Sequence, residues 1–182
     1  MPPRIAVYGS SLVSERDPGY RLAYELGTEL ARKGATVVTG GYGGVMEAAS
    51  RGAAEAGGHV VGVTVELEAH RGPGNRWVAE RVHTKDLLER LRHLVIEPDA
   101  RIALEPSPGT LTEVFLAWTL ANFGEIKPGS LVLLGPQWPD FLEANRDVML
   151  NVLPLVTCAS TVNEAVKLAL TASKRPVVRV VP

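Results

Sequence analysis

The chain has 182 residues, the length of one ordinary domain. Hydrophobic residues make up 46% and charged residues 21%, and no segment approaches the ~20 consecutive apolar residues of a membrane-spanning helix. A single cysteine, Cys158, excludes a disulfide framework and fits a reducing compartment. The net charge of −1 argues against a protein that works mainly by binding nucleic-acid phosphates. We therefore expect a cytoplasmic protein whose partners include neither nucleic acid nor membrane.

Short apolar runs and amphipathic stretches alternate along the chain. The apolar runs predict buried strands over residues 5–9, 35–39, 59–64, 100–104, 130–134 and 155–158, with a further short strand over 78–82. The amphipathic stretches predict helices over residues 17–33, 45–56, 84–94, 109–123, 139–150 and 161–172. Strands that are apolar throughout and joined by helices indicate a parallel sheet covered on both faces. We predict one Rossmann-like, doubly wound α/β domain over residues 1–182, of which 173–182 form a tail.

Ligands of open α/β sheets bind at the carboxyl ends of the strands, so the loops there are candidate sites. The first loop, Gly9-Ser10-Ser11, offers a flexible backbone and two hydroxyl groups to an anion, although an ordinary polar loop is the simpler explanation. The second has four glycines within residues 40–44, at a helix start where the helix dipole favours an anion. Its spacing matches neither the dinucleotide pattern nor a Walker A loop. Four glycines exceed what a tight turn needs, which favours close approach of a ligand.

The third loop, residues 104–113, precedes the most hydrophobic predicted helix. Thr110 and Glu113 have the spacing of a capping box, which explains both residues without a ligand. Gly109 and Thr110 at a helix start also have the arrangement of an anion site. These residues alone do not decide between the two interpretations.

Several other residues have an explanation that needs no ligand. Arg90 is spaced to form a surface ion pair with Asp86, although such pairs contribute only ~0.3–0.5 kcal/mol and give little reason for an arginine. Trp118 is expected in the core or in a dimer interface, and Cys158 is expected to be an inert buried thiol. The histidines lack the spacing of metal ligands, so we expect neither a metal nor a cofactor.

These loops together resemble one family, the LOG-type phosphoribohydrolases, long labelled lysine decarboxylases. Residues 7–11 (V-Y-G-S-S) are similar to the family's C-G-S-S loop, and residues 39–46 resemble its G-G-G-x-x-G-L-M stretch. Residues 98–113 fall where the family has S-D-A-F-I-A-L-P-G-G-x-G-T-x-x-E, and the arginine of its R-K pair falls on Arg90. The resemblance covers roughly residues 5–134.

The resemblance implies cleavage of the N-glycosidic bond of an adenosine 5′-monophosphate to the free base and ribose 5-phosphate. It places the 5′-phosphate at Gly109 and Thr110, and it makes Arg90 and Glu113 the catalytic pair. Glu113 would stabilise the cationic sugar or orient the water, and Arg90 would polarise the base or anchor the phosphate. The remaining residues implied to bind the nucleotide are Gly9, Ser10, Ser11, Gly40, Gly41, Gly43, Gly44 and Met46. The family requires no metal, and it implies a homodimer or a larger homo-oligomer.

The chain departs from the family's pattern mainly at the third loop. Residues 105–108 (E-P-S-P) replace P-G-G-x, which removes two possible N–H donors and brings a negative charge near the expected phosphate. Leu91 replaces the lysine after Arg90, and Glu47 replaces the glycine after Met46. Three alternatives therefore stay open. They are a phosphoribohydrolase, a non-catalytic carrier of a phosphorylated ligand similar to molybdenum-cofactor carriers, and a DNA-processing relative, which the net charge disfavours.

Overall fold

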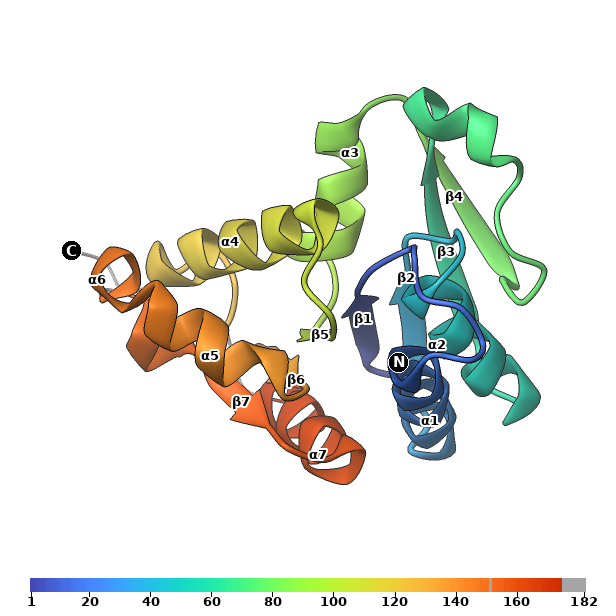
Figure 1. Cartoon of the computed structure of the whole chain (residues 1–182). Coiled ribbons are helices and arrows are strands. Elements are labelled where there is room, and N and C mark those ends of the chain that lie inside the picture. The colour runs from blue at the N-terminus through green and yellow to red at the C-terminus, as the bar shows by residue number, and fades with distance from the viewer. Residues whose placement is uncertain (151, 175–182) are drawn as a thin grey trace.

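A computed structural model describes residues 1–150 and 152–174 of the chain (Figure 1). Its strands form one 7-stranded sheet, parallel throughout, in the order β4-β3-β2-β1-β5-β6-β7. The strands are β1 (Arg4–Tyr8), β2 (Thr36–Thr39), β3 (Val60–Val65), β4 (Glu80–Thr84), β5 (Ala100–Ala103), β6 (Leu131–Leu134) and β7 (Thr157–Ala159). β3, β5 and β6 are buried along their whole length, as continuously apolar runs predict. The doubly wound, Rossmann-like α/β fold is thereby confirmed.

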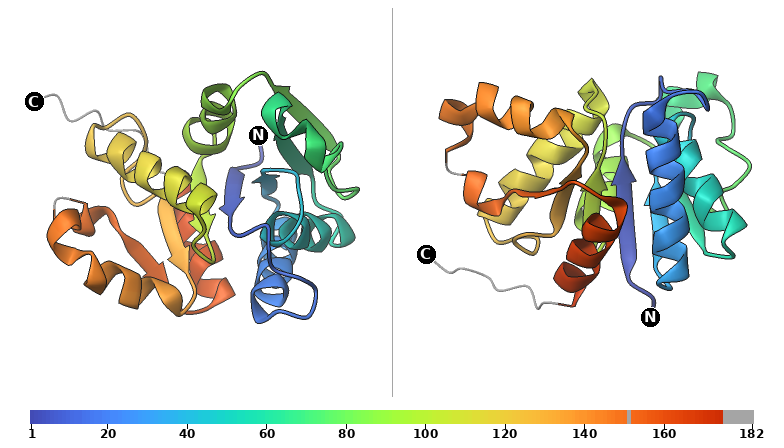
Figure 2. Two further views of the ribbon diagram at one scale, coloured as in Figure 1. Left: turned by 45° about the horizontal axis from the view of Figure 1, so that its top comes forward. Right: turned by 60° about the horizontal axis from the view of Figure 1, so that its bottom comes forward.

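Helices cover both faces of the sheet, and Figure 2 shows them from two further sides. One face carries α1 (Pro18–Arg32), α2 (Val45–Glu55) and α7 (Val162–Ser173). The other face carries α3 (Leu87–Leu91), the π-helical turn η2 (Arg92–Ile96), α4 (Pro108–Asn122), α5 (Gln137–Ala144) and α6 (Arg146–Met149). Two short 3₁₀ helices, η1 (Glu66–Arg71) and η3 (Leu153–Leu155), lie in the connections. The two faces therefore each have a hydrophobic core of their own, with β1 and β5 between them.

Two of the predicted helices are wrong in their extent. The helix expected over 84–94 begins only after Asp86, and it widens into η2 before Pro98. The helix expected over 139–150 begins earlier and is divided into α5 and α6 at Asn145, whose side-chain amide donates to the Phe141 carbonyl oxygen at 2.8 Å. That side-chain bond satisfies a carbonyl oxygen near the end of α5 and favours an end to the helix there.

Smaller differences occur at the edges of the sheet. The short strand expected over 78–82 is displaced by two residues to β4, and the last strand is β7 rather than residues 155–158 because η3 occupies its start. Cys158, expected to be buried, is exposed on β7. From residue 175 on, the predicted tail lies outside the described residues. Among the helices described, none is both long and apolar enough to cross a membrane.

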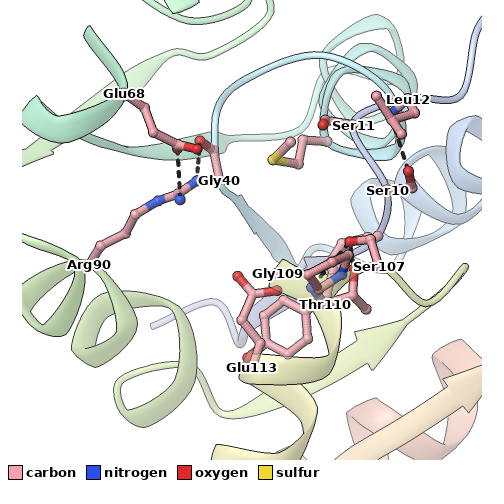
Figure 3. Close-up of a pocket in the computed structure, with 15 residues that line it drawn as sticks. Ser10, Ser11, Leu12, Gly40, Glu68, Arg90, Ser107, Gly109, Thr110 and Glu113 are labelled. Atoms are coloured by element: carbon pink, nitrogen blue, oxygen red, sulfur yellow. Dashed lines mark hydrogen bonds and ion pairs between the residues drawn. The ribbon is translucent and has the colours of Figure 1, made fainter.

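The topology opens a crevice between the two central strands. β1 pairs with β5, yet the chain leaves β1 toward α1 on one face and leaves β5 toward α4 on the other. The loops at the carboxyl ends of these strands therefore move apart, which is where ligands of doubly wound sheets bind. The crevice lies at the end of the sheet where residues 9–12 and the first turn of α4 face each other (Figure 3).

Candidate active site

A cavity of about 370 Å³ occupies this crevice, within the range of about 300–1,000 Å³ that is usual for small-molecule sites. It is lined by the loops that follow β1, β2 and β5, together with η1 and α3 (Figure 3). The structure brings most of the predicted site residues to it, namely Gly9, Ser10, Ser11, Gly40, Met46, Arg90, Gly109, Thr110 and Glu113. Gly41, Gly43 and Gly44 do not line it. Gly43 instead faces a neighbouring cavity of about 480 Å³.

Arg90 enters the cavity from α3 and is held by three acceptors and an aromatic ring. Its Nε donates to the Val63 carbonyl oxygen at 3.0 Å, and its Nη2 donates to the Gly40 carbonyl oxygen at 3.1 Å. Its Nη1 forms an ion pair with Oε2 of Glu68 at 3.0 Å, and the guanidinium lies 5.4 Å from the ring centre of Tyr42. The side chain is only 11% exposed. Arg90 therefore has a fixed place, unlike an arginine in a solvated surface pair.

The alternative explanation of Arg90, a surface ion pair with Asp86, does not hold, because Arg90 pairs with Glu68. Asp86 caps α3, because its carboxylate accepts the backbone N–H of Glu89 at 2.8 Å. The position of Arg90 also explains one of the glycines. A Cβ at Gly40 would lie 2.5 Å from Nη2 of Arg90 and 2.6 Å from Sδ of Met46. Gly40 thus makes room for two side chains of the site.

Glu113 enters the same cavity from the second turn of α4 (Figure 3). Burial of the carboxyl group raises its pKa from 4.5 to about 8, and the nearby Glu68 adds to the rise while the Arg90 guanidinium opposes it. Burial is the largest of these effects. At pH 7 Glu113 is therefore a neutral carboxylic acid that can donate a hydrogen bond or a proton.

Of the two interpretations left open for Thr110 and Glu113, the structure excludes the capping box. Ser107 is the N-cap of α4, and its Oγ accepts the backbone N–H of Thr110 at 3.3 Å and lies 2.9 Å from the Thr110 hydroxyl oxygen. Pro108 occupies the first helical position, which suits its fixed φ and its missing N–H. Glu113 lies beyond the first turn, so capping does not explain it.

The first turn of α4 faces the cavity with donors available to an anion. The N–H of Gly109 lies in the first turn and has no intrahelical acceptor, and a Cβ added at this residue would meet nothing within 4 Å. The hydroxyl groups of Ser107 and Thr110 share one hydrogen bond and line the same wall. The positive end of the helix dipole points in this direction.

Two of the departures from the family's motif lie away from the cavity. The Glu105 side chain packs against Gly19 at the start of α1, and neither Glu105 nor Pro106 lines the cavity. The Glu105 carboxylate, which we expected near a phosphate, therefore lies at the N-terminus of α1 instead. Of the two prolines, only Pro108 borders the cavity.

The glycine loop after β2 has a partly structural explanation. Gly41 and Gly44 have φ values of +77° and +66°, which favour glycine. A Cβ at Gly44 would also collide with the backbone of Ser10 and Ser11. Gly43 alone in this loop borders open space, apart from the Ser11 carbonyl oxygen at 4.0 Å.

Sequence reasoning missed several residues of the site, among them Glu68 and Tyr8. Both line the cavity, and Tyr8 donates its buried hydroxyl to the Leu94 carbonyl oxygen at 2.7 Å. Glu68 follows β3 and Tyr8 ends β1, and these positions could have identified both residues, because side chains at strand ends surround a switch-point site. Within residues 1–150 and 152–174, no three His, Cys, Asp or Glu side chains gather in a way that could hold a metal ion.

Comparisons with known proteins place the chain among related sequences and folds. The profile of the SLOG cluster4 family matches residues 2–123. An uncharacterized protein of Archaeoglobus fulgidus is 34% identical over 114 residues, which cover 63% of this chain and 72% of that protein. The cytokinin riboside 5'-monophosphate phosphoribohydrolase of Mycobacterium tuberculosis is 34% identical over 122 residues. That alignment covers 66% of this chain and 64% of the relative, less than two thirds of the relative's length.

Solved structures with the same fold cover almost the whole chain. The molybdenum cofactor binding protein from Rippkaea orientalis has a TM-score of 0.75 and 29% identity, over 94% of this chain and 97% of its own. The molybdenum cofactor carrier protein from Chlamydomonas reinhardtii has the same TM-score of 0.75 and 29% identity, over 96% and 100%. DNA processing protein A from Helicobacter pylori, with a TM-score of 0.63 and 17% identity, shares the fold alone.

Proposed function

Because the chain belongs to the SLOG cluster4 family, we propose that it hydrolyses the N-glycosidic bond of a nucleoside 5′-monophosphate. The products are the free base and ribose 5-phosphate. The observation that carries the proposal is the presence of a neutral Glu113 and a fixed Arg90 in one cavity at the switch point of the sheet. Buried titratable groups with strongly shifted pKa values in a cleft are typical of catalytic sites.

The reaction needs both an acid and a stabiliser of positive charge. The C1′–N bond breaks, the oxygen of a water bonds to C1′, and one proton of that water replaces the sugar on the base. The transition state resembles an oxocarbenium ion, and the base departs with the bonding electron pair, so its protonation makes it a neutral leaving group. Glu113 can donate its proton to the base. The resulting carboxylate then stabilises the cationic sugar and recovers a proton from the attacking water.

The pKa of Glu113 suits this cycle. A general acid works best when its pKa lies near the operating pH, since it is then protonated yet able to release the proton. Burial alone would hold the proton more tightly, and the Arg90 guanidinium brings the pKa back to about 8. Three of the five N–H groups of Arg90 are engaged by the protein, so two remain for the ligand.

The phosphate is assigned to the first turn of α4. The Gly109 N–H, the Ser107 and Thr110 hydroxyl groups and the helix dipole all act there on an anion. Pro108 removes one donor from this cradle, but its place at the first helical position leaves the helix start intact. A monophosphate group therefore has fewer backbone contacts than in the family's glycine-rich loop, and hydroxyl groups take their place.

A second candidate function is a carrier of a phosphorylated ligand. It is favoured by the two molybdenum cofactor proteins, which match this chain over at least 94% of its length and at least 97% of their own. The named phosphoribohydrolase of Mycobacterium tuberculosis matches over 64% of its own length. In a carrier, the neutral Glu113 would donate a hydrogen bond to the ligand without transferring its proton.

Incubation of the protein with AMP, followed by chromatography of the products, tests the proposal. We expect adenine and ribose 5-phosphate in equal amounts, with adenosine as a poor substrate because it lacks the phosphate. Glu113→Gln and Arg90→Ala should each reduce the rate by about 100-fold or more, the usual effect of losing an acid–base group. Full activity of either variant would refute the assignment of the pair. Inactivity on every 5′-monophosphate together with tight binding of a phosphorylated compound would favour the carrier.

A further inference from the structure

A buried arginine lies beneath the site, on the strand that leads to α4. Arg101 of β5 is only 1% exposed, and it stands where the quoted LOG-type stretch has a phenylalanine. Its Nε donates to the Val95 carbonyl oxygen at 2.7 Å, and its Nη2 donates to the carbonyl oxygens of Ile96 at 3.2 Å and Pro98 at 2.6 Å. Its Nη1 donates to the Ser130 hydroxyl at 2.7 Å. The proposed reaction gives this guanidinium no role.

Three of these four bonds go to the end of a single segment. The last carbonyl groups of η2 have few backbone donors downstream, because Pro98 has no N–H and the Asp99 N–H is taken by the Arg4 carbonyl oxygen at 2.8 Å. Side chains from the sheet supply the missing donors. Tyr8 on β1 bonds the Leu94 carbonyl oxygen, and Arg101 bonds those of Val95, Ile96 and Pro98. A cation at this end of a helix also opposes the negative end of the helix dipole.

The segment that Arg101 caps is the one that carries Arg90. α3 and η2 are continuous from Leu87 to Ile96, so Arg90 lies one helical turn before Leu94. π-helical turns are rare, and they occur often at functional sites because they displace the neighbouring residues. Burying a charge is costly unless every donor finds a partner. Here three of the four acceptors are carbonyl groups at the end of the turn, so a movement of the turn would leave most of these bonds unmade.

We propose that Arg101 is a positioning residue, which fixes the π-helical turn and thereby holds Arg90 opposite Glu113 in the cavity. Arg101 does not line the cavity and touches no ligand. Arg101 affects the reaction only by fixing the position of Arg90. The inference rests on the proposed function only for its catalytic consequence, because the placement of Arg90 is a property of the protein without ligand.

The ionisation of Glu113 reports the placement of Arg90. The charged or titratable groups around it are Arg90 from α3, Glu68 from η1 and Tyr8 from β1. Arg90 lowers the pKa of Glu113, while Glu68 raises it. Displacement of Arg90 should therefore raise the pKa of Glu113. A neighbouring cation shifts a carboxyl pKa by about 1–3 units, so its partial displacement should give a rise of about 0.5–1 unit.

The experiment is an NMR pH titration of protein labelled with ¹³C at the glutamate carboxyl carbon, with the Glu113 signal assigned by its loss in Glu113→Gln. We expect Arg101→Met to raise the midpoint by about 0.5–1 unit and Arg101→Lys to raise it less. Ser130→Ala is the matched control. It removes the hydroxyl that accepts from Nη1 of Arg101 and leaves the three carbonyl bonds and the interaction with Tyr8, so the midpoint should stay at the wild-type value.

A double-mutant cycle separates positioning from general loosening of the fold. In an Arg90→Ala background, Arg101→Met should cause no further shift, because the group through which it acts is gone. A midpoint that stays at the wild-type value in Arg101→Met would overturn the proposal, as would a shift of equal size in the Arg90→Ala background. If Arg101→Met does not fold, Arg101→Lys is judged by the same two criteria. The titration needs neither ligand nor turnover, so failure of the hydrolase proposal would leave its result intact.

Discussion

Replacing Glu113 with glutamine should stabilise the protein, by an amount that grows with pH. The folded state holds a proton on Glu113 up to about pH 8, whereas the unfolded chain releases it near pH 4.5. Between these values the folded state binds more protons than the unfolded state, so folding stability falls as the pH rises. Glutamine has the shape of the protonated acid and does not titrate, so the folding stability of the variant does not fall with pH at this position.

The size of the effect follows from the pKa shift. A shift of about 3.5 units corresponds to about 5 kcal/mol once the pH exceeds both pKa values, and to about 3 kcal/mol at pH 7. These values are upper bounds, because structural relaxation around the ionised group reduces them. Between about pH 5 and pH 8 the stability difference between variant and wild type should grow by up to about 1.4 kcal/mol per pH unit.

Urea denaturation of both proteins at several pH values measures this difference. With a slope of about 1–3 kcal/mol per molar urea, a difference of about 3 kcal/mol at pH 7 moves the midpoint upward by about 1–3 M. Near pH 4, below both pKa values, the two midpoints should almost coincide. A stability difference that is independent of pH would refute the reasoning, since it would mean that Glu113 titrates alike in both states. A more stable but inactive variant would be a trade-off of the kind common at active sites.

Three further changes test other parts of the site. Gly40→Ala should lower kcat/KM for AMP by about tenfold or more, since the added carbon would lie 2.5 Å from Nη2 of Arg90, and unchanged kinetics would contradict this packing. Glu68→Gln removes the 3.0 Å ion pair with Arg90 and a negative charge that raises the pKa of Glu113. The pH above which the rate falls should therefore move to lower pH, and an unchanged or higher value would contradict this. Phe123 is 71% exposed at the end of the apolar helix α4, so Phe123→Glu should convert a homo-oligomer into monomers in light scattering. Equal masses of wild type and variant would place the interface elsewhere.

The strand-end loops were predictable because their signals are local. Glycines, hydroxyl groups and a helix start after a buried strand indicate the carboxyl edge of the sheet, and nine of the twelve predicted site residues do line the cavity. The place of Arg90 was not predictable in the same way. Its acceptors on Val63 and Gly40 are 27 and 50 residues away, and no local pattern specifies such contacts.

Two local signals did not survive in the tertiary structure. Thr110 and Glu113 have the spacing of a capping box, but α4 begins at Pro108 with Ser107 as its N-cap. The helix expected over 84–94 shows the same limit. Its charged residues have helical spacing, but carbonyl groups of η2 accept from Tyr8 and Arg101, and the local spacing contains neither residue.

The pH dependence of kcat/KM for AMP hydrolysis tests the central claim most directly. If Glu113 acts as the general acid, the rate constant should be level below about pH 8 and fall tenfold per pH unit above it, because the free enzyme's acid is then deprotonated. The same descending limb should be absent from the residual activity of Glu113→Gln. A rate that rises through pH 8, or a descending limb that survives in the variant, would contradict the account.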